Sequence, residues 1–296
     1  MDDPLMPVFG RVLTAMVTPM DADGAVDIAR ARQLAARLVD EQSNDALVIN
    51  GTTGESPTTT EQEKAALVAA VVEEVGDRAQ VLAGVGSSDT RHTIELARQA
   101  ADAGADGLLV VTPYYLRPPQ RGILQHFLSV ADATELPLMA YDIPHRAGVP
   151  IEEQTLLAMA EHPRIVAVKD AKGDLASSSR VIAGSTLAYY SGDDAMTLPL
   201  LAVGGVGVVG TSTHFTGTRT REMVAAFVSG DVERALALHQ SLLGVYCGVF
   251  ATQGVMLVKA GLAHQGFDVG GVRAPLPQPT EDEVRTFAAL LDAADL

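Results

Sequence analysis

Short, continuously apolar runs recur along the whole first two thirds of the chain. Strands that alternate apolar and polar residues have one face in water, whereas uninterrupted runs of four or five residues are typical of parallel strands covered on both faces. The runs are Leu13–Val17, Ala46–Ile49, Val81–Val85, Gly107–Val111, Leu138–Tyr141, Ile165–Val168, Leu187–Tyr190 and Gly207–Val209.

Segments of helical period separate these runs. In the first segment, one helix face carries Ile28, Leu34 and Leu38. The second segment opens with Thr60 and has Glu63 three residues later, a pattern that satisfies two free N–H donors at a helix start. Eight strand–helix units predict a (β/α)8 barrel, with an open, doubly wound sheet as the alternative.

From about Arg219 onward only helical periods remain, at 217–228, 231–246, 249–264 and 280–293. The last of them opens with Thr280 and Glu283, again a capping box. The first is expected to close the barrel. We therefore predict a barrel over residues 1–229 and a C-terminal appendage of three helices over residues 230–296.

Composition excludes several classes of protein. The chain has 296 residues, of which 47% are hydrophobic, and a net charge of −16. This charge argues against nucleic acid and against an anionic membrane surface as partners, since both attract Lys and Arg clusters. The start, Met1–Pro4, lacks the basic and apolar regions of a signal peptide. A single cysteine, Cys247, fits a reducing, cytoplasmic location.

The residues that end the runs are the candidates for chemistry, because active sites of such barrels lie at the C-terminal ends of the strands. The second run ends in Asn50–Glu55 and the fourth in Thr112–Tyr115. The fifth ends in Tyr141–Pro144, with Arg146 just beyond. Hydroxyls, phenols and a guanidinium are thus expected on one face of the barrel.

Lys169 ends the sixth run and is one of four lysines in the chain. Burial at this position disfavours the ammonium form, and an amine with a lowered pKa is the nucleophile of Schiff-base chemistry. The alternative is a structural lysine paired with Asp170 or with another carboxylate at a strand end.

Two further features have both a chemical and a structural interpretation. The Tyr141 phenol could transfer protons, or it could be a core tyrosine with its hydroxyl on a backbone group. Gly51–Gly54 offers N–H groups and hydroxyls suited to a small carboxylate, or it could be an ordinary turn. Their occurrence together at consecutive strand ends favours function.

The same segments carry a family resemblance, from about Val12 to beyond Ser191 and more weakly to the end. Its motifs are Thr14-Ala15-Met16-Val17-Thr18-Pro19-Met20, Gly51-Thr52-Thr53-Gly54-Glu55-Ser56, Val111-Thr112-Pro113-Tyr114-Tyr115, Tyr141-Asp142-Ile143-Pro144, Val168-Lys169-Asp170 and Ser191-Gly192-Asp193-Asp194. In this order and spacing, they resemble the pyruvate-dependent aldolases of the dihydrodipicolinate synthase family.

The resemblance implies roles for individual residues. Lys169 would form an imine with pyruvate, while Tyr141 would donate and accept protons in a relay with Thr52 and Tyr115. In the family the residue matching Tyr115 reaches into a neighbouring subunit, which implies a homo-oligomer, dimer or tetramer. The remaining implied contacts are to substrate: Thr53, Gly192 and the backbone near Val209, and Arg146 on the carboxylate of aspartate semialdehyde.

The chain departs from the family pattern at some positions. Asp142 and Asp170 stand where Asn and Glu are common. The segment Gly210–His214 replaces a more usual stretch that contains Ser-Val, so the rim of the pyruvate pocket differs. The rival function within the family is an aldolase or dehydratase acting on a sialic acid or a 2-keto-3-deoxy sugar acid. Arg146 and the Thr52-Thr53 pair favour the synthase over this rival, and binding of a small acid without turnover is a third possibility.

Other signals indicate no metal or cofactor. Gly205–Gly210 matches G-x-G-x-x-G, but a dinucleotide fingerprint must follow a strand and open a helix, and here it overlaps the eighth run. The seven histidines show no metal-ligand spacing, which disfavours a metal-dependent aldolase.

The resemblance also bears on inhibition by lysine. In regulated relatives lysine binds beside the residue matching Tyr114, in a pocket that matches Ser56, Glu61, Lys64, Ser88 and His92 here. Lys64 stands where those enzymes have a histidine, and His92 where they have a glutamate. Since like charge repels a cationic ligand, we expect weak inhibition or none.

Overall fold

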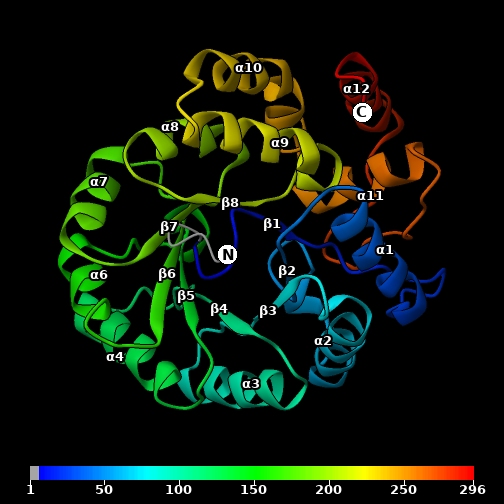
Figure 1. Ribbon diagram of the computed structural model, residues 1–296. Helices are drawn as coiled ribbons and strands as arrows, with labels where there is room; N and C mark the ends of the chain where they lie inside the picture. The colour runs from blue at the N-terminus through cyan, green and yellow to red at the C-terminus, as the bar shows by residue number, and fades with distance from the viewer. Residues whose placement is uncertain (1–6) are drawn as a thin grey trace.

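The barrel is closed, and its eight strands follow one another in chain order, each parallel to its neighbours (Figure 1). The structure is a computed structural model and describes residues 7–296, so the expectation about Met1–Pro4 lies outside the described residues. The strands are β1 Val12–Ala15, β2 Ala46–Ile49, β3 Gln80–Gly84, β4 Gly107–Val111, β5 Leu138–Asp142, β6 Ile165–Asp170, β7 Ala188–Ser191 and β8 Gly207–Gly210. The predicted (β/α)8 barrel is confirmed, and the open sheet is excluded.

Helices follow the strands and form an outer ring (Figure 1). They are α1 Ile28–Asp40, η1 Ser56–Thr58, α2 Glu61–Val75, α3 Thr90–Asp102, α4 Gln120–Ala131, α5 Pro144–Ala147, α6 Glu153–Met159, α7 Leu175–Gly184, η2 Asp194–Met196, α8 Thr197–Ala202, α9 Thr213–Val228, α10 Val232–Gly248, α11 Gly254–His264 and α12 Glu281–Ala293. Within residues 7–296, none of these helices combines the length and the apolar character needed to cross a membrane.

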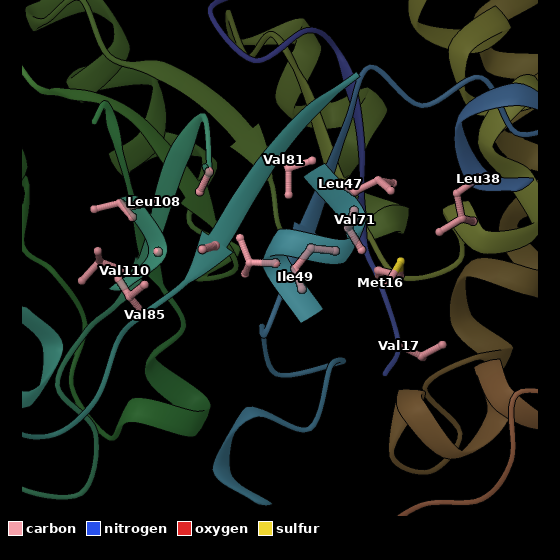
Figure 2. Packing of buried hydrophobic residues seen from close by; sticks show 14 of the residues in the cluster. Met16, Val17, Leu38, Leu47, Ile49, Val71, Val81, Val85, Leu108 and Val110 are labelled. Atoms are coloured by element: carbon pink, nitrogen blue, oxygen red, sulfur yellow. The ribbon is translucent and has the colours of Figure 1, made fainter. Parts of the chain in front are cut away.

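Along β2 to β7, the residues of each strand belong to two separate apolar clusters. One cluster fills the barrel and includes Val48, Leu82, Leu109 and Tyr141. The other lies between the strands and the helices, where residues such as Leu47 pack against α1 and α2 (Figure 2). Because side chains alternate along a strand, a continuous apolar run supplies both clusters at once.

Side-chain caps fix where several helices begin. Thr60 accepts a hydrogen bond from Glu63 N, and the Glu63 carboxylate accepts one from Thr60 N, so the predicted capping box at α2 is confirmed. The box predicted at Thr280 and Glu283 is also present, at the start of α12. Each box satisfies two of the N–H donors that a helix start leaves free.

The C-terminal helices pack beside the barrel, with α10 along α9 and α12 against α11 (Figure 1). The helix predicted at 217–228 begins earlier, at Thr213, and the one predicted at 249–264 begins later, at Gly254. In the second case the apolar period continues without a break from the end of α10, although the chain turns between Val249 and Gln253. The division into a barrel over 1–229 and an appendage over 230–296 stays a prediction.

A buried ion pair joins α11 to the turn after β2. Lys259 Nζ lies 2.8 Å from Glu55 Oε1, and both side chains are at most 3% exposed. Glu55 Oε2 accepts a hydrogen bond from Arg273 N at 2.9 Å, and Lys259 Nζ also donates to Gly271 O. A position in α11 is thereby linked directly to the segment that carries Thr52 and Thr53.

Replacing Lys259 by Met should lower the free energy of unfolding by about 3–5 kcal/mol, because the Glu55 carboxylate would stay buried without its cation. The double variant Glu55→Gln/Lys259→Met should lose less of its free energy of unfolding, since no unpaired buried charge remains. Urea unfolding at one protein concentration measures both.

Arg285→Met is the control for this comparison. Its partner Asp282 is 78% exposed, and such surface pairs contribute at most about 1 kcal/mol. If Lys259→Met and Arg285→Met lowered the free energy of unfolding equally, the buried pair would contribute no more to stability than the exposed pair.

Candidate active site

The predicted site residues gather at the C-terminal ends of the strands. Their places in the fold are as follows: Thr52 and Thr53 in the turn after β2, Tyr115 after β4, Tyr141 in β5, Arg146 on α5, Lys169 in β6, Gly192 after β7 and Val209 in β8. All of these strands are parallel in one closed barrel, so their C-terminal ends share one face.

Lys169 is buried beside Tyr141. The two residues are paired in the register of β5 and β6, and Lys169 Nζ lies 4.3 Å from the centre of the Tyr141 ring. Burial lowers the pKa of Lys169 to about 8; the Asp194 carboxylate opposes this shift and the Arg146 guanidinium adds to it. A substantial neutral fraction of this amine is therefore present near neutral pH.

Asp170 is not the partner of Lys169. Its Oδ1 accepts a hydrogen bond from Lys172 N at 2.8 Å, and its Oδ2 accepts one from Ser178 Oγ at 2.5 Å. Within residues 7–296 no carboxylate forms a salt bridge with Lys169. The interpretation of Lys169 as a lysine in a structural ion pair is thus excluded for the described residues.

The Tyr141 phenol is buried at the bottom of the site. Burial raises its pKa, while the Arg146 guanidinium and a hydrogen bond with Thr52 act in the opposite direction. The phenol is therefore protonated at neutral pH, beside an amine with a lowered pKa. Thr52 itself is exposed, so the Tyr141 phenol lies between the buried Lys169 amine and the solvent-exposed side of the site.

The turn after β2 has strained backbone at both ends. Asn50 and Glu55 have φ values of 61° and 56°, the left-handed region that non-glycine residues seldom occupy. The Glu55 carboxylate is held by Lys259, as described above. At the other side of the turn, Thr53 Oγ1 lies 3.4 Å from Thr211 Oγ1, which brings the ends of β2 and β8 together.

Asp194 lies in one of the family motifs, but no role in the site was predicted for it. Its buried carboxylate accepts hydrogen bonds from Thr211 N, Ser212 N and Ser212 Oγ, at 3.1, 3.1 and 2.6 Å. It thus fixes the segment that departs from the family pattern. A Cβ at Gly210 would lie 2.6 Å from Asp194 Oδ1, so only glycine fits there. The carboxylate was visible at a strand end, but its partners lie some 17 residues away in the chain.

Gln253 is a second residue for which no role in the site was predicted. Arg146 is exposed at the rim of the site, and its Nη2 donates to Gln253 Oε1 at 3.1 Å. Gln253 occupies the N-cap position of α11 without a side-chain capping bond, and nothing in the local sequence marks it. The guanidinium therefore sits between the barrel and the C-terminal helices.

A cleft of about 1150 Å³ opens at this face. Thr52, Tyr141 and Arg146 line one part of it, and the other part extends along α2 and α3 to Lys64 and His92. Tyr115, which also lines the cleft, is 89% exposed and has a φ of 69°. The Tyr115 side chain is thus left uncovered by the described residues of this subunit.

The two signals discounted in the sequence can be located in the structure. Gly207–Gly210 is β8 itself, so the G-x-G-x-x-G pattern does not lie between a strand and a helix as a dinucleotide site requires. No group of three or more His, Cys, Asp or Glu that could hold a metal ion occurs within residues 7–296.

A buried amine with a lowered pKa, beside a phenol at the C-terminal face of a (β/α)8 barrel, is the arrangement of a lyase that works through a Schiff base. The family model described as the dihydrodipicolinate synthetase family matches residues 8–294. The chain belongs to this family.

Individual relatives agree over nearly the full length. The chain is 63% identical over 290 residues to 4-hydroxy-tetrahydrodipicolinate synthase of Cutibacterium acnes, covering 98% of this chain and 99% of that protein. It is 61% identical to 4-hydroxy-tetrahydrodipicolinate synthase 2 of Streptomyces coelicolor, covering 93% and 92%. A solved synthase from Cyanidioschyzon merolae, with lysine bound, superposes with a TM-score of 0.96 at 40% identity and covers 98% and 99%.

Proposed function

We propose that the protein acts as a 4-hydroxy-tetrahydrodipicolinate synthase, condensing pyruvate with L-aspartate 4-semialdehyde through a Schiff base on Lys169. The observation that carries the proposal is the Lys169 amine, which is buried, forms no salt bridge within residues 7–296 and has a pKa of about 8. Relatives more than 60% identical are named for the product, 4-hydroxy-tetrahydrodipicolinate, which pyruvate and aspartate semialdehyde form together with loss of water.

The chemistry starts from the neutral amine. With a pKa of about 8, roughly one tenth of the Lys169 side chains are uncharged at pH 7. The amine attacks the keto carbon of pyruvate, and the resulting carbinolamine loses water to give an imine. Loss of a methyl proton converts the imine to an enamine, whose carbon attacks the aldehyde carbon of the second substrate. No metal or cofactor is needed for these steps.

Tyr141 would move the protons. Its protonated phenol contacts the Lys169 side chain, and its hydrogen bond with Thr52 leads toward the cleft. Loss of water from the carbinolamine needs a proton donor at the departing hydroxyl, and the phenol is in the right state to supply it. Tyr115 would complete this relay from a neighbouring subunit, which fits its exposed side chain. A homo-oligomer, dimer or tetramer, is therefore part of the proposal.

The remaining residues would hold the substrates. Thr53, Gly192 and the backbone at Val209 would hold pyruvate, and Gly192 lies so close to Lys169 that a Cβ there would be 3.1 Å from Lys169 Cγ. Arg146 is exposed at the rim, and its planar fork suits the carboxylate of aspartate semialdehyde. A cytoplasmic location completes the proposal, since a reducing compartment suits the single, exposed Cys247.

Borohydride reduction with pyruvate present should add a pyruvate-derived mass to the peptide that contains Lys169, and Lys169→Ala should abolish both the adduct and turnover. Tyr141→Phe should slow turnover by roughly 10²–10⁴-fold, the range for a lost general acid–base group. Peptide mass spectrometry and steady-state kinetics measure these effects. Full activity in Lys169→Ala would exclude the mechanism.

The substrate assignment predicts that the enzyme uses pyruvate with aspartate semialdehyde and fails to cleave sialic acid or 2-keto-3-deoxy sugar acids. Arg146→Ala should weaken use of the semialdehyde while the borohydride-trapped pyruvate adduct still forms. A coupled assay and the trapping experiment separate these steps. Equal loss of adduct and condensation would contradict a separate carboxylate role for Arg146.

Lysine should inhibit this enzyme weakly or not at all, in contrast to what lysine bound to the Cyanidioschyzon merolae relative suggests. In the second part of the cleft, His92 Nδ1 lies 3.6 Å from Glu61 Oε1, so this carboxylate already has a neighbour. Lys64 lines the same part, and its like charge opposes a cationic ligand. A titration of L-lysine at saturating pyruvate measures this. Half-inhibition well below about 1 mM, a binding free energy beyond roughly −4 kcal/mol, would contradict it.

A further inference from the structure

The ends of β5 and β6 present two pairs of side chains on opposite faces. Tyr141 pairs with Lys169, and the next register position pairs Asp142 with Asp170. Tyr141 belongs to the cluster inside the barrel, so the alternation along a strand turns Asp142 and Asp170 toward the helices. Both carboxylates are buried there, at 1% and 7% exposed.

The two carboxylates differ in how well they are satisfied. Both oxygens of Asp170 accept hydrogen bonds, as described above. Asp142 Oδ1 accepts one from Ile151 N at 3.1 Å, but Oδ2 accepts none from the described residues. The only salt bridge of Asp142 within residues 7–296 joins Oδ2 to Lys172 Nζ, at 3.4 Å.

The Lys172 ammonium therefore pairs with one of the two buried carboxylates, that of Asp142, and also donates to Ser177 Oγ at 3.3 Å. Burial and the neighbouring Asp170 raise the pKa of Asp142 to about 6, against the effect of Lys172. The Tyr189 hydroxyl, also buried, has no hydrogen-bond partner among the described residues, so it does not donate to either carboxylate. The other titratable groups around this region are Glu153 on α6 and, lining an adjacent cavity of about 200 Å³, His145, Asp174 and Asp193.

We propose that Lys172 and Asp142 form a positioning pair that holds the ends of β5 and β6 in the register which places Tyr141 against Lys169. Lys172 follows β6 and reaches across to the last residue of β5. Between them, Ala171 N donates to Asp142 O at 2.9 Å, so ion pair and backbone bond close the two strand ends together. The proposal rests on the proposed function for the roles of Tyr141 and Lys169.

The pair also accounts for the departure of Asp142 from the family pattern. An asparagine at this position could accept the same bond from Ile151 N without bringing a charge into the layer between barrel and helices. An aspartate there needs a cation, and Lys172 is the residue that supplies it. Position 172 should therefore matter only while position 142 carries a carboxylate.

A double-mutant cycle tests this dependence. Lys172→Met should lower kcat at pH 7 by about ten-fold, in the range of coupling between contacting charged residues, and Lys172→Arg should lose much less. Asp142→Asn/Lys172→Met should match Asp142→Asn within about three-fold. Arg234→Met is the control, since its pair with Glu222 is exposed on α10 and α9, away from the site, and its loss should leave kcat unchanged.

The pH profile separates positioning from general stability. In the wild type, protonation of the Lys169 amine slows turnover below about pH 8, and kcat should fall more steeply as the pH drops through about 6, because protonation of Asp142 removes the ion pair. This second fall should move to higher pH in Lys172→Met and disappear in Asp142→Asn. An unchanged second fall in Asp142→Asn would overturn the proposal.

A readout without substrate distinguishes this proposal from the proposed function. The rate at which acetic anhydride acetylates Lys169 reports the environment of its amine, whether or not pyruvate is the substrate. Lys172→Met should change this rate several-fold, and the double variant should restore it to the value of Asp142→Asn. If the wild-type protein forms no pyruvate adduct but the variants show these acetylation rates, the proposed function is wrong and the positioning role of the pair is retained.

The following results would overturn the proposed role of the pair. If the adduct forms but acetylation and kcat are the same in wild type and Lys172→Met, the pair does not position the site. If Lys172→Met does not fold, Asp142→Asn and the double variant still decide. If kcat of the double variant were ten-fold lower than that of Asp142→Asn, Lys172 would act independently of Asp142.

Discussion

The structure depends on one constraint, the alternation of side chains along parallel strands that are covered on both faces. A side chain buried inside a closed barrel loses most of the water that would solvate an ammonium, and one buried between barrel and helices loses the water that would solvate a carboxylate. At the ends of β5 and β6 both situations occur in consecutive residues: Tyr141 and Lys169 face inward, Asp142 and Asp170 outward. The reactive amine and the buried acidic pair are thus two consequences of the same strand geometry.

Much of the fold was predictable because its cause is local. A run such as Gly107–Val111 is apolar throughout, and no neighbour is needed to infer that both of its faces are buried. The position of Lys169 was predictable for the same reason, since it directly ends such a run. The capping box at Thr60 is likewise contained within four residues.

The supports of the site were not predictable, because each joins residues far apart in the chain. Glu55 meets Lys259, Arg146 meets Gln253, and Asp194 meets the segment after β8. A sequence shows each of these residues as an ordinary polar position. Only the closed barrel and the packing of α11 beside it determine which of them are neighbours, so the site could be located from the sequence but not assembled.

The lysines show how this assembly selects the nucleophile. Lys64 and Lys172 are partly covered, whereas Lys169 and Lys259 are almost completely buried. Burial lowers the pKa of both buried amines, so desolvation alone does not separate them. What separates them is the partner: Lys259 has the Glu55 carboxylate at 2.8 Å, which stabilises its charged form, and Lys169 has no salt bridge among the described residues. Because Asp194 forms no salt bridge with Lys169, the desolvated amine keeps a neutral fraction that can react.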